Sequence, residues 1–337
     1  MSKEDFPINS DTTYIIAEGE INHNGSVETA LDMVSAAKDA GADAIKFQYI
    51  VADEIAAKST SFHELFSKVE LSFEEFFVIK DKASALGLDF FITAPSLGTL
   101  PQVNQLEPCF IKIGSTNITN IPLLEGIAAL GRPVILSTGA SRLGEIENAL
   151  IALTGVSVAL LHCTVNYPAN PEDLNLRAIS TMRSAFPGRV IGYSDHSLGS
   201  TAAVAATVLG ARIIEKHFTL DKSMNGPDHS FSSDPMEFAQ LVAAVRTCEK
   251  SLGTGIKEPS ASEANVPKVA RRFVVAARNI LTGIPITASD LNYRRVDYVP
   301  GLVRVEECGV ITGMSAPKDY AVGEALNWVH FKAGGKA

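Results

Sequence analysis

The sequence has little of what marks secreted or membrane-spanning proteins. Only four cysteines occur in 337 residues and no two form a CxxC pair, so neither a disulfide framework nor a cysteine zinc site is expected. No apolar run approaches the length of about 18 residues that a transmembrane helix needs. The opening stretch MSKEDFPINSDTT has no apolar signal core. We therefore expect a cytoplasmic protein that does not bind membranes.

Positive charge is also scarce. The chain has 29 Lys and Arg against 38 Asp and Glu, a formal net charge of -9, and no run of basic residues. This balance makes nucleic acid an unexpected partner. Hydrophobic residues make up 46% and charged residues 20%, which is typical of globular proteins, and the length suits about two domains.

Short apolar runs alternate with helical patterns over the first 250 residues or so. We predict eight strands, at Tyr14–Ala17, Ala42–Phe47, Leu88–Thr93, Phe110–Ile113, Val134–Ser137, Val156–His162, Val190–Gly192 and Arg212–His217. Near-continuous apolar strands separated by helices indicate a parallel sheet. Eight such units favour an α/β fold of the (β/α)8 TIM-barrel type. The stretch EGEINHNG at the end of the first strand lacks the GxGxxG pattern of a dinucleotide-binding sheet.

The pattern changes after Leu252. The stretch GTGIKEPSASEANVPK has no apolar period and is typical of a linker. Short β-like runs then follow, such as FVVAAR and NWVHF. We predict a barrel catalytic domain over 1–253, a linker over 254–270 and a small, mostly β domain over 271–337.

Polar residues end the predicted strands, where barrel enzymes carry their chemistry. They include Glu18, Lys46, Gln48, Lys112, Ser115, Ser137, Ser194, His196 and His217. Two lysines beside several hydroxyls supply the donors that hold a phosphate and a carboxylate. Without a ligand, so many polar groups on one rim would carry a desolvation cost.

Two histidines fall on neighbouring strand ends. His196 and His217 sit at the ends of the seventh and eighth predicted strands, so their imidazoles can meet around a divalent metal in an open site. Glu18 ends the first strand and has two interpretations that stay open. It either positions or deprotonates a water, or it forms a salt bridge with Lys46.

The sequence resembles the sialic acid synthases over essentially its whole length. The resemblance is carried by IIAE..INHNGS (15–26), AGADAIKFQ (40–48), KIGS (112–115), TNIPLLEGIAALGRPVILSTGAS (119–141), LLHCT..YP (160–168), GYSDHSLG (192–199), GA..IEKHFTLD (210–221) and GPDHSFS (226–232). The tail, with ARNILTGIPITASDL and YRR, is similar to the antifreeze-like (SAF) domain of that family.

The resemblance implies a synthase that condenses phosphoenolpyruvate with an N-acylated hexose to a nonulosonic acid and phosphate. The hexose would be N-acetylmannosamine or a 2,4-diacetamido-trideoxyhexose. The resemblance assigns His196 and His217 to a manganese ion, with magnesium or cobalt as alternatives. Phosphoenolpyruvate would be held by Lys46, Lys112, Ser115, Ser137 and Ser194. Glu18 would lie near the reacting carbons, with Gln48, Tyr167 and Asp228 facing the sugar. Arg295 would reach the other subunit's site in a domain-swapped homodimer.

The chain departs from the family pattern at several positions. The departures are Glu20, Ala94, Thr116, Asn117 and Val165. Most of them are expected on the sugar side or near the phosphate pocket. They leave open which hexose is accepted, and they motivate the alternative of a sugar-binding paralogue without turnover. A second alternative is an aldolase that forms a Schiff base on Lys46 or Lys112.

Overall fold

The structure, a computed structural model, describes residue 8 and residues 12–333. Most of the N-terminal stretch searched for a signal peptide lies outside the described residues, so that expectation stays a prediction. The described residues form two compact units that divide between Thr254 and Gly255. Each unit is described here by itself.

The first unit is a closed barrel of eight parallel strands in sequence order, with β1 paired to both β2 and β8. The strands are β1 (Tyr14–Glu20), β2 (Ala44–Gln48), β3 (Asp89–Thr93), β4 (Ile111–Ile113), β5 (Val134–Ser137), β6 (Val158–Cys163), β7 (Ile191–Asp195) and β8 (Ile213–His217). All eight predicted strands are present, and the prediction of a (β/α)8 barrel is confirmed.

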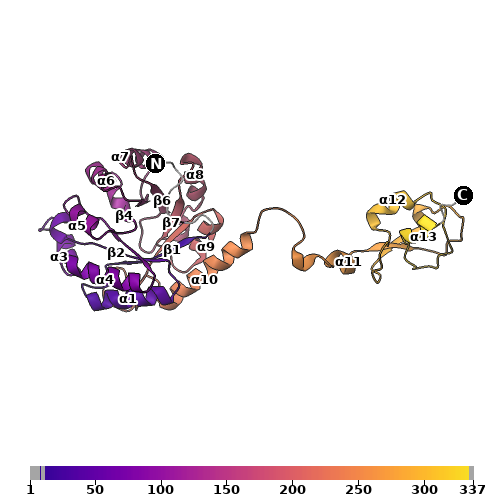
Figure 1. Cartoon of the computed structure of the whole chain (residues 1–337), viewed down its shortest axis with the longest axis horizontal. Coiled ribbons are helices and arrows are strands. Elements are labelled where there is room, and N and C mark those ends of the chain that lie inside the picture. The colour runs from indigo at the N-terminus through magenta and orange to yellow at the C-terminus, as the bar shows by residue number, and fades with distance from the viewer. Residues whose placement is uncertain (1–7, 9–11, 334–337) are drawn as a thin grey trace. The chain divides into compact units, whose positions relative to one another are not determined.

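Helices surround the barrel strands (Figure 1). They are α1 (Val27–Asp39), α2 (Ala52–Ile55), α3 (Ser61–Ser67), α4 (Phe73–Ala85), α5 (Leu100–Gln105), η1 (Ser115–Asn117), α6 (Ile121–Ala129), α7 (Leu143–Ala152), η2 (Pro171–Asp173), α8 (Arg177–Ala185), α9 (Thr201–Val208) and α10 (Pro235–Leu252). Side chains cap the first turns of α1, α3, α4, α6 and α10. At α4, for example, Ser72 and Glu75 form a capping box. Among the described residues, none of the helices is long and apolar enough to cross a membrane.

Side chains alternate between the two faces of each barrel strand. Apolar residues such as Ile15 and Ile45 face outward and pack against the helices. The inward positions begin with a buried apolar layer that includes Ile16, Ala44 and Ile213. Two residues further along those three strands the inward positions are Glu18, Lys46 and Glu215. The same period of two therefore builds the apolar floor of the barrel and a polar layer above it.

The second unit holds a small antiparallel sheet of β9 (Phe273–Ala276) and β10 (Leu291–Arg294). Its own core includes Val274, Ile286, Val303 and Tyr320. Its helical turns are η3 (Ala261–Glu263), α11 (Val266–Ala270), η4 (Ala288–Asp290), η5 (Val305–Glu307), α12 (Cys308–Ile311) and α13 (Trp328–Ala333). The first two lie in the predicted linker, where the side chains of residues 254–266 are all exposed. The assignment of this unit to the SAF type stays a prediction.

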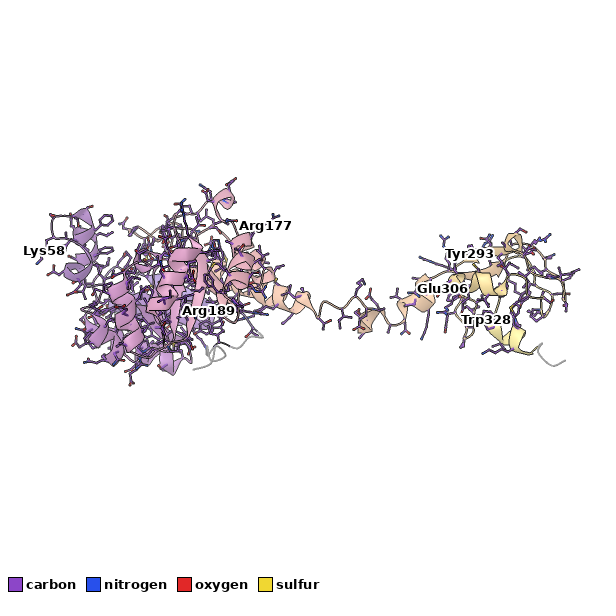
Figure 2. The ribbon with its side chains drawn as sticks, turned by 90° about the horizontal axis from the view of Figure 1, so that it is seen from above. Lys58, Arg177, Arg189, Tyr293, Glu306 and Trp328 are labelled. Carbon is purple, nitrogen blue, oxygen red and sulfur yellow. The ribbon has the colours of Figure 1, made fainter. Side chains whose placement is uncertain are left out.

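We predict that Asp290→Asn lowers the free energy of unfolding of the second unit by about 2 kcal/mol, because hydrogen bonds to charged groups contribute about 1.5–3 kcal/mol. The buried carboxylate accepts from the Thr287 amide at 2.8 Å and hydroxyl at 2.6 Å, and pairs with Arg278. Arg278 and Thr287 hold the pKa of Asp290 well below its ordinary value. Its stabilising effect is therefore full above about pH 4 and is lost as the pH falls. Fluorescence of Trp328, the only tryptophan of the chain, reports on this unit (Figure 2).

Asp319→Asn is the matched control. Asp319 accepts from the amide and hydroxyl of Thr282 at 2.7 and 2.8 Å, but its side chain is exposed. We expect this variant to change the free energy of unfolding by no more than about 0.5 kcal/mol. If both variants lost the same free energy of unfolding, burial of Asp290 would not be the reason for its larger contribution.

Candidate active site

Two lysines converge inside the barrel on one carboxylate. Lys46 comes from β2, and Lys112 comes from β4. Glu215 from β8 has carboxylate oxygens 3.7 Å from the Lys46 amine and 3.4 Å from the Lys112 amine. Lys46 also forms an ion pair with Glu18, its cross-strand neighbour on β1. All four side chains are only 4% exposed, so this polar layer is almost entirely removed from water.

Hydroxyl groups complete the layer. Lys112 donates to the Ser137 hydroxyl at 2.8 Å, and Lys46 donates to the Thr93 hydroxyl at 3.0 Å. Ser194 donates to Glu215 at 2.8 Å. The predicted Lys112, Ser137 and Ser194 are therefore brought together with Lys46. Glu18 occupies the salt-bridge position that the sequence left open.

Ser115 lies beside this layer in a tightly packed loop. Its hydroxyl accepts from the Gly139 amide at 2.9 Å and lies 3.3 Å from the Cys163 sulfur. A Cβ at position 139 would lie 2.3 Å from Val165 and 2.6 Å from that sulfur. Only glycine fits there, which explains the Gly-bearing turn after β5. Val165, one of the departures, packs on this turn.

The electrostatics of the layer set the charge of its members. Burial lowers the pKa of Lys46 to about 7, and Lys112 adds to this effect while Glu215 opposes it. Burial acts against ionisation of Glu215, but Lys112 and Lys46 outweigh it and lower the pKa of Glu215 to about 2. Glu215 is therefore an anion placed beside both lysine amines. Sequence reasoning missed it, although its spacing of two from His217 on β8 was a usable signal.

The two predicted imidazoles lie side by side. The ring centres of His196 and His217 are 5.3 Å apart. The Nδ1 atom of His196 bonds to the Thr164 carbonyl at 2.7 Å, which leaves Nε2 as its available nitrogen. Tyr167 lies against both rings, with ring centres 4.3 Å from His196 and 5.6 Å from His217.

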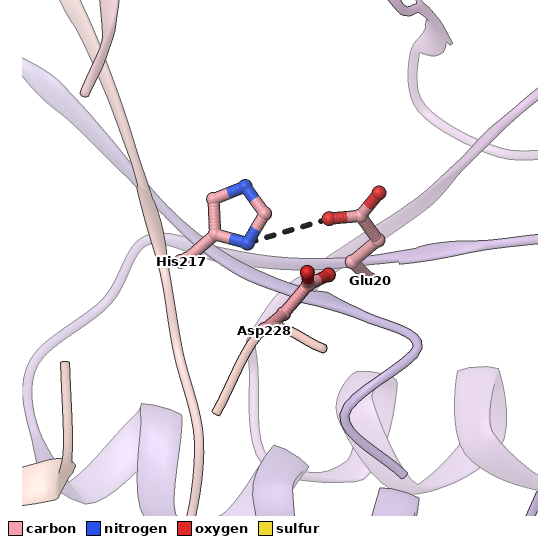
Figure 3. Close-up of side chains that lie close together, drawn as sticks. All are labelled: Glu20, His217 and Asp228. Carbon is pink, nitrogen blue, oxygen red and sulfur yellow. Dashed lines mark ion pairs between the residues drawn. The ribbon is translucent and has the colours of Figure 1, made fainter. Parts of the chain in front are cut away.

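Two carboxylates join His217 (Figure 3). Its Nδ1 atom lies 3.3 Å from a carboxylate oxygen of Glu20, and ligand atoms of Glu20, His217 and Asp228 all lie within 4.8 Å of one another. Burial and the neighbouring Asp228 raise the pKa of Glu20 well above its ordinary value. Burial and His196 lower the pKa of His217 far below its own, so its imidazole is neutral.

This group fits a divalent cation. Neutral imidazole and carboxylate are suitable ligands. The Nδ1 atom of His217 is buried and has no hydrogen-bond partner among the described residues. The sequence singled out Glu20 only as a departure and Asp228 only as a sugar-facing residue. The structure brings both to His217.

Gln48 ends β2. It lines a cavity of about 760 Å3 together with Glu54, Thr116 and Asn117. The two departures at 116 and 117 therefore share a cavity wall with Gln48. Ala94, a third departure, is fully buried.

Arg295 belongs to the second unit and donates to the Ala270 carbonyl at 3.1 Å. Its predicted reach into the site of another subunit stays a prediction, as does the homodimer.

A closed parallel barrel that gathers buried polar side chains at the carboxyl ends of its strands has the architecture of a (β/α)8 enzyme. Residues 33–257 match the model of the NeuB family. The chain belongs to the NeuB family, and the predicted enzyme of the sialic acid synthase type is confirmed.

The chain is similar to several known proteins. An uncharacterized protein of Methanocaldococcus jannaschii is 45% identical over 84% of this chain and 85% of its own length. The N,N'-diacetyllegionaminic acid synthase of Legionella pneumophila is 37% identical over 96% and 95%. The crystal structure of the N-acetylneuraminic acid (sialic acid) synthetase of Leptospira borgpetersenii, in complex with citrate, has a TM-score of 0.73 at 38% identity and covers 77% of this chain and 91% of that one.

Proposed function

We propose that this protein condenses phosphoenolpyruvate with an N-acylated hexose to give a nine-carbon nonulosonic acid and inorganic phosphate. The observation that carries the proposal is the buried layer of Lys46, Lys112 and their hydroxyl partners at the mouth of the barrel. It offers charge and donors to a phosphate and a carboxylate at once. The names of the relatives and the family membership support the product class. They differ in the acid that they make, so the acceptor stays open between N-acetylmannosamine and a 2,4-diacetamido-trideoxyhexose.

The reaction balances without an oxidant or a reductant. The enol carbon of phosphoenolpyruvate attacks the aldehyde carbon of the open-chain sugar and forms the new carbon–carbon bond. Water adds to the cationic carbon that results, and cleavage of the carbon–oxygen bond releases phosphate. Lys46 and Lys112 stabilise negative charge on the phosphate and carboxylate as the tetrahedral intermediate forms. Holding both substrates at one rim removes much of the entropic barrier.

The other groups have supporting roles in this proposal. The Glu18 carboxylate accepts a hydrogen bond from the Glu20 amide at 2.7 Å. It orients the water that adds to the cationic carbon of the substrate. His196 and His217 would hold a divalent cation. When bound, that ion supplies Lewis acidity for the sugar aldehyde.

We expect the purified full-length protein to release phosphate only when phosphoenolpyruvate, an acceptor sugar and Mn2+ are all present. A phosphate-release assay over the two candidate sugars measures this. Excess chelator should reduce the rate to background, because the sugar aldehyde is not polarised without the metal ion. Added Mn2+ should restore the rate.

Three outcomes would count against the proposal. Full activity in excess chelator would show that the reaction does not need the metal ion. Phosphate release without the sugar would indicate a phosphatase. Sugar binding by calorimetry without any release over the panel favours the non-catalytic paralogue.

The pKa of about 7 for Lys46 also suits a Schiff-base aldolase, because a neutral amine is the nucleophile in that chemistry. The ion pair of Lys46 with Glu18 argues against a free amine. We therefore expect no covalent adduct when the protein is treated with borohydride and pyruvate. A trapped adduct at Lys46 would favour the aldolase.

A further inference from the structure

We propose that the divalent cation of this chain is held by carboxylate as well as imidazole, with Glu20 and Asp228 binding it beside His217. This inference concerns the cation of the proposed function and rests on it. It goes further because it gives Glu20 a direct role as a ligand. The chain would thus have an oxygen-rich metal site where a pair of imidazoles alone was predicted.

The distances support a shared ligand. The Nδ1 atom of His217 is 3.3 Å from Glu20, and the three ligand atoms lie within 4.8 Å of one another (Figure 3). A metal ion bonded to carboxylate oxygen and to imidazole nitrogen at about 2.0–2.2 Å separates such atoms by roughly 3–4 Å. The separation of Glu20 from His217 falls in this range, and side-chain movements of up to about 1 Å would bring Asp228 into it.

Burial points to a ligand independently of the spacing. The side chain of His217 is only 7% exposed. Its Nδ1 atom contacts the Glu20 carboxylate at 3.3 Å but makes no hydrogen bond among the described residues. An unsatisfied buried polar atom of this kind costs free energy unless something binds it. A cation would also offset the repulsion that arises when two carboxyl groups lying against each other are both ionised.

The backbone at Glu20 indicates that its side chain has a function. Glu20 lies at a bulge between Glu18 and Glu20 in β1 and has a φ of 40°. This left-handed conformation favours glycine and is strained for glutamate. Such strain occurs where a side chain is needed. The carboxylate of Glu20 points toward His217 (Figure 3). Metal binding together with His217 would explain why glutamate occupies this position.

The chemistry of the ligand set gives an expected preference. Carboxylate suits Mg2+ and Mn2+, whereas imidazole suits later transition metals. With two carboxylates present, Mg2+ should compete with Mn2+ better than at a site of imidazoles alone. Loss of the Glu20 carboxylate should therefore weaken Mg2+ binding more than Mn2+ binding.

The test is direct titration of the full-length protein with Mn2+ and with Mg2+ by calorimetry, with free Mn2+ followed by electron paramagnetic resonance. The variants are Glu20→Gln and Glu20→Gly. We expect Mn2+ affinity to fall by at least about tenfold in both, since even groups that only orient a ligand cost about 10–100-fold. The unfolding midpoint of Glu20→Gly should stay unchanged or rise, because glycine relieves the strain. If Glu20 had only a structural role, its replacement would lower the unfolding midpoint together with the Mn2+ affinity.

Glu54→Gln is the control, because Glu54 lies on the same rim but outside the ligand group. Its Mn2+ affinity should match the wild type. If Glu20→Gln binds Mn2+ as tightly as the wild type while His217→Ala does not, the carboxylate inference is wrong and the proposed function stands. If the wild type binds no Mn2+ but still releases phosphate, both the inference and the metal in the proposed function are wrong.

Discussion

Replacing Lys112 by methionine is expected to lower kcat/KM for phosphoenolpyruvate by about 10²–10³-fold, the loss found when one preorganised donor is removed from a transition state. Lys112 is almost fully buried, 2.8 Å from the Ser137 hydroxyl and 3.4 Å from Glu215. No other cation of the layer can take its position, because Lys46 is held by Glu18 and Thr93. The measurement is the phosphate-release assay with the better acceptor at saturation.

Lys80→Met is the control for this experiment. The Lys80 amine lies on α4, outside the barrel strands, and donates to the Leu106 carbonyl at 2.8 Å. We expect its kcat/KM to match the wild type. Thermal unfolding of both variants shows whether the fold is kept. A folded Lys112→Met enzyme with wild-type kcat/KM would show that Lys112 does not contribute to the reaction.

The barrel and its lysines could be predicted because they depend on local patterns. Apolar runs of strand length mark each strand, and the first polar residue on the inner face follows from the period of two. Lys46 and Lys112 are inward for this reason. Their shared partner Glu215 obeys the same rule. It was missed because the period of two shows that Glu215 faces inward but does not show which residues of other strands it contacts. Its partners come from β2 and β4, which are not neighbours of β8 in the barrel.

The cation group depends on features that have no simple sequence signal. The bulge in β1 shifts the register so that Glu18 pairs with Lys46 but Glu20 pairs with Phe47. That shift decides where the Glu20 carboxylate points. Asp228 reaches His217 from the long connection between β8 and α10, and the path of a loop is not fixed by periodicity. His217 is the last residue of β8 and His196 directly follows β7, so the imidazole pair was predictable from the strand ends. Its carboxylate neighbours were not.

Lys216 shows how the alternation of one strand separates function from stability. It lies between Glu215 and His217 but on the opposite, outward face. Its amine is 2.9 Å from Asp195 and also bonds to the Ser197 carbonyl. Asp195 in turn accepts from the Ser197 amide at 2.9 Å and hydroxyl at 2.6 Å. This network fixes the turn that carries His196.

We predict that Lys216→Met lowers the free energy of unfolding of the barrel by about 3–5 kcal/mol, because removal of one partner leaves a buried charge without its counter-ion. Lys216 is 1% and Asp195 is 0% exposed, so water cannot replace the ammonium group. The measurement is urea unfolding followed by far-UV circular dichroism, since most helical residues belong to the barrel.

Two further variants make this last prediction specific. The double variant Lys216→Met, Asp195→Asn should recover much of the loss, because the uncompensated charge is then gone. Lys222→Met breaks an ion pair with Glu237 at 3.0 Å whose side chains are 34% and 39% exposed, and it should cost no more than about 1 kcal/mol. Equal losses for Lys216→Met and Lys222→Met would mean that the pair at Asp195 is solvated. The turn that carries His196 would then need another source of rigidity.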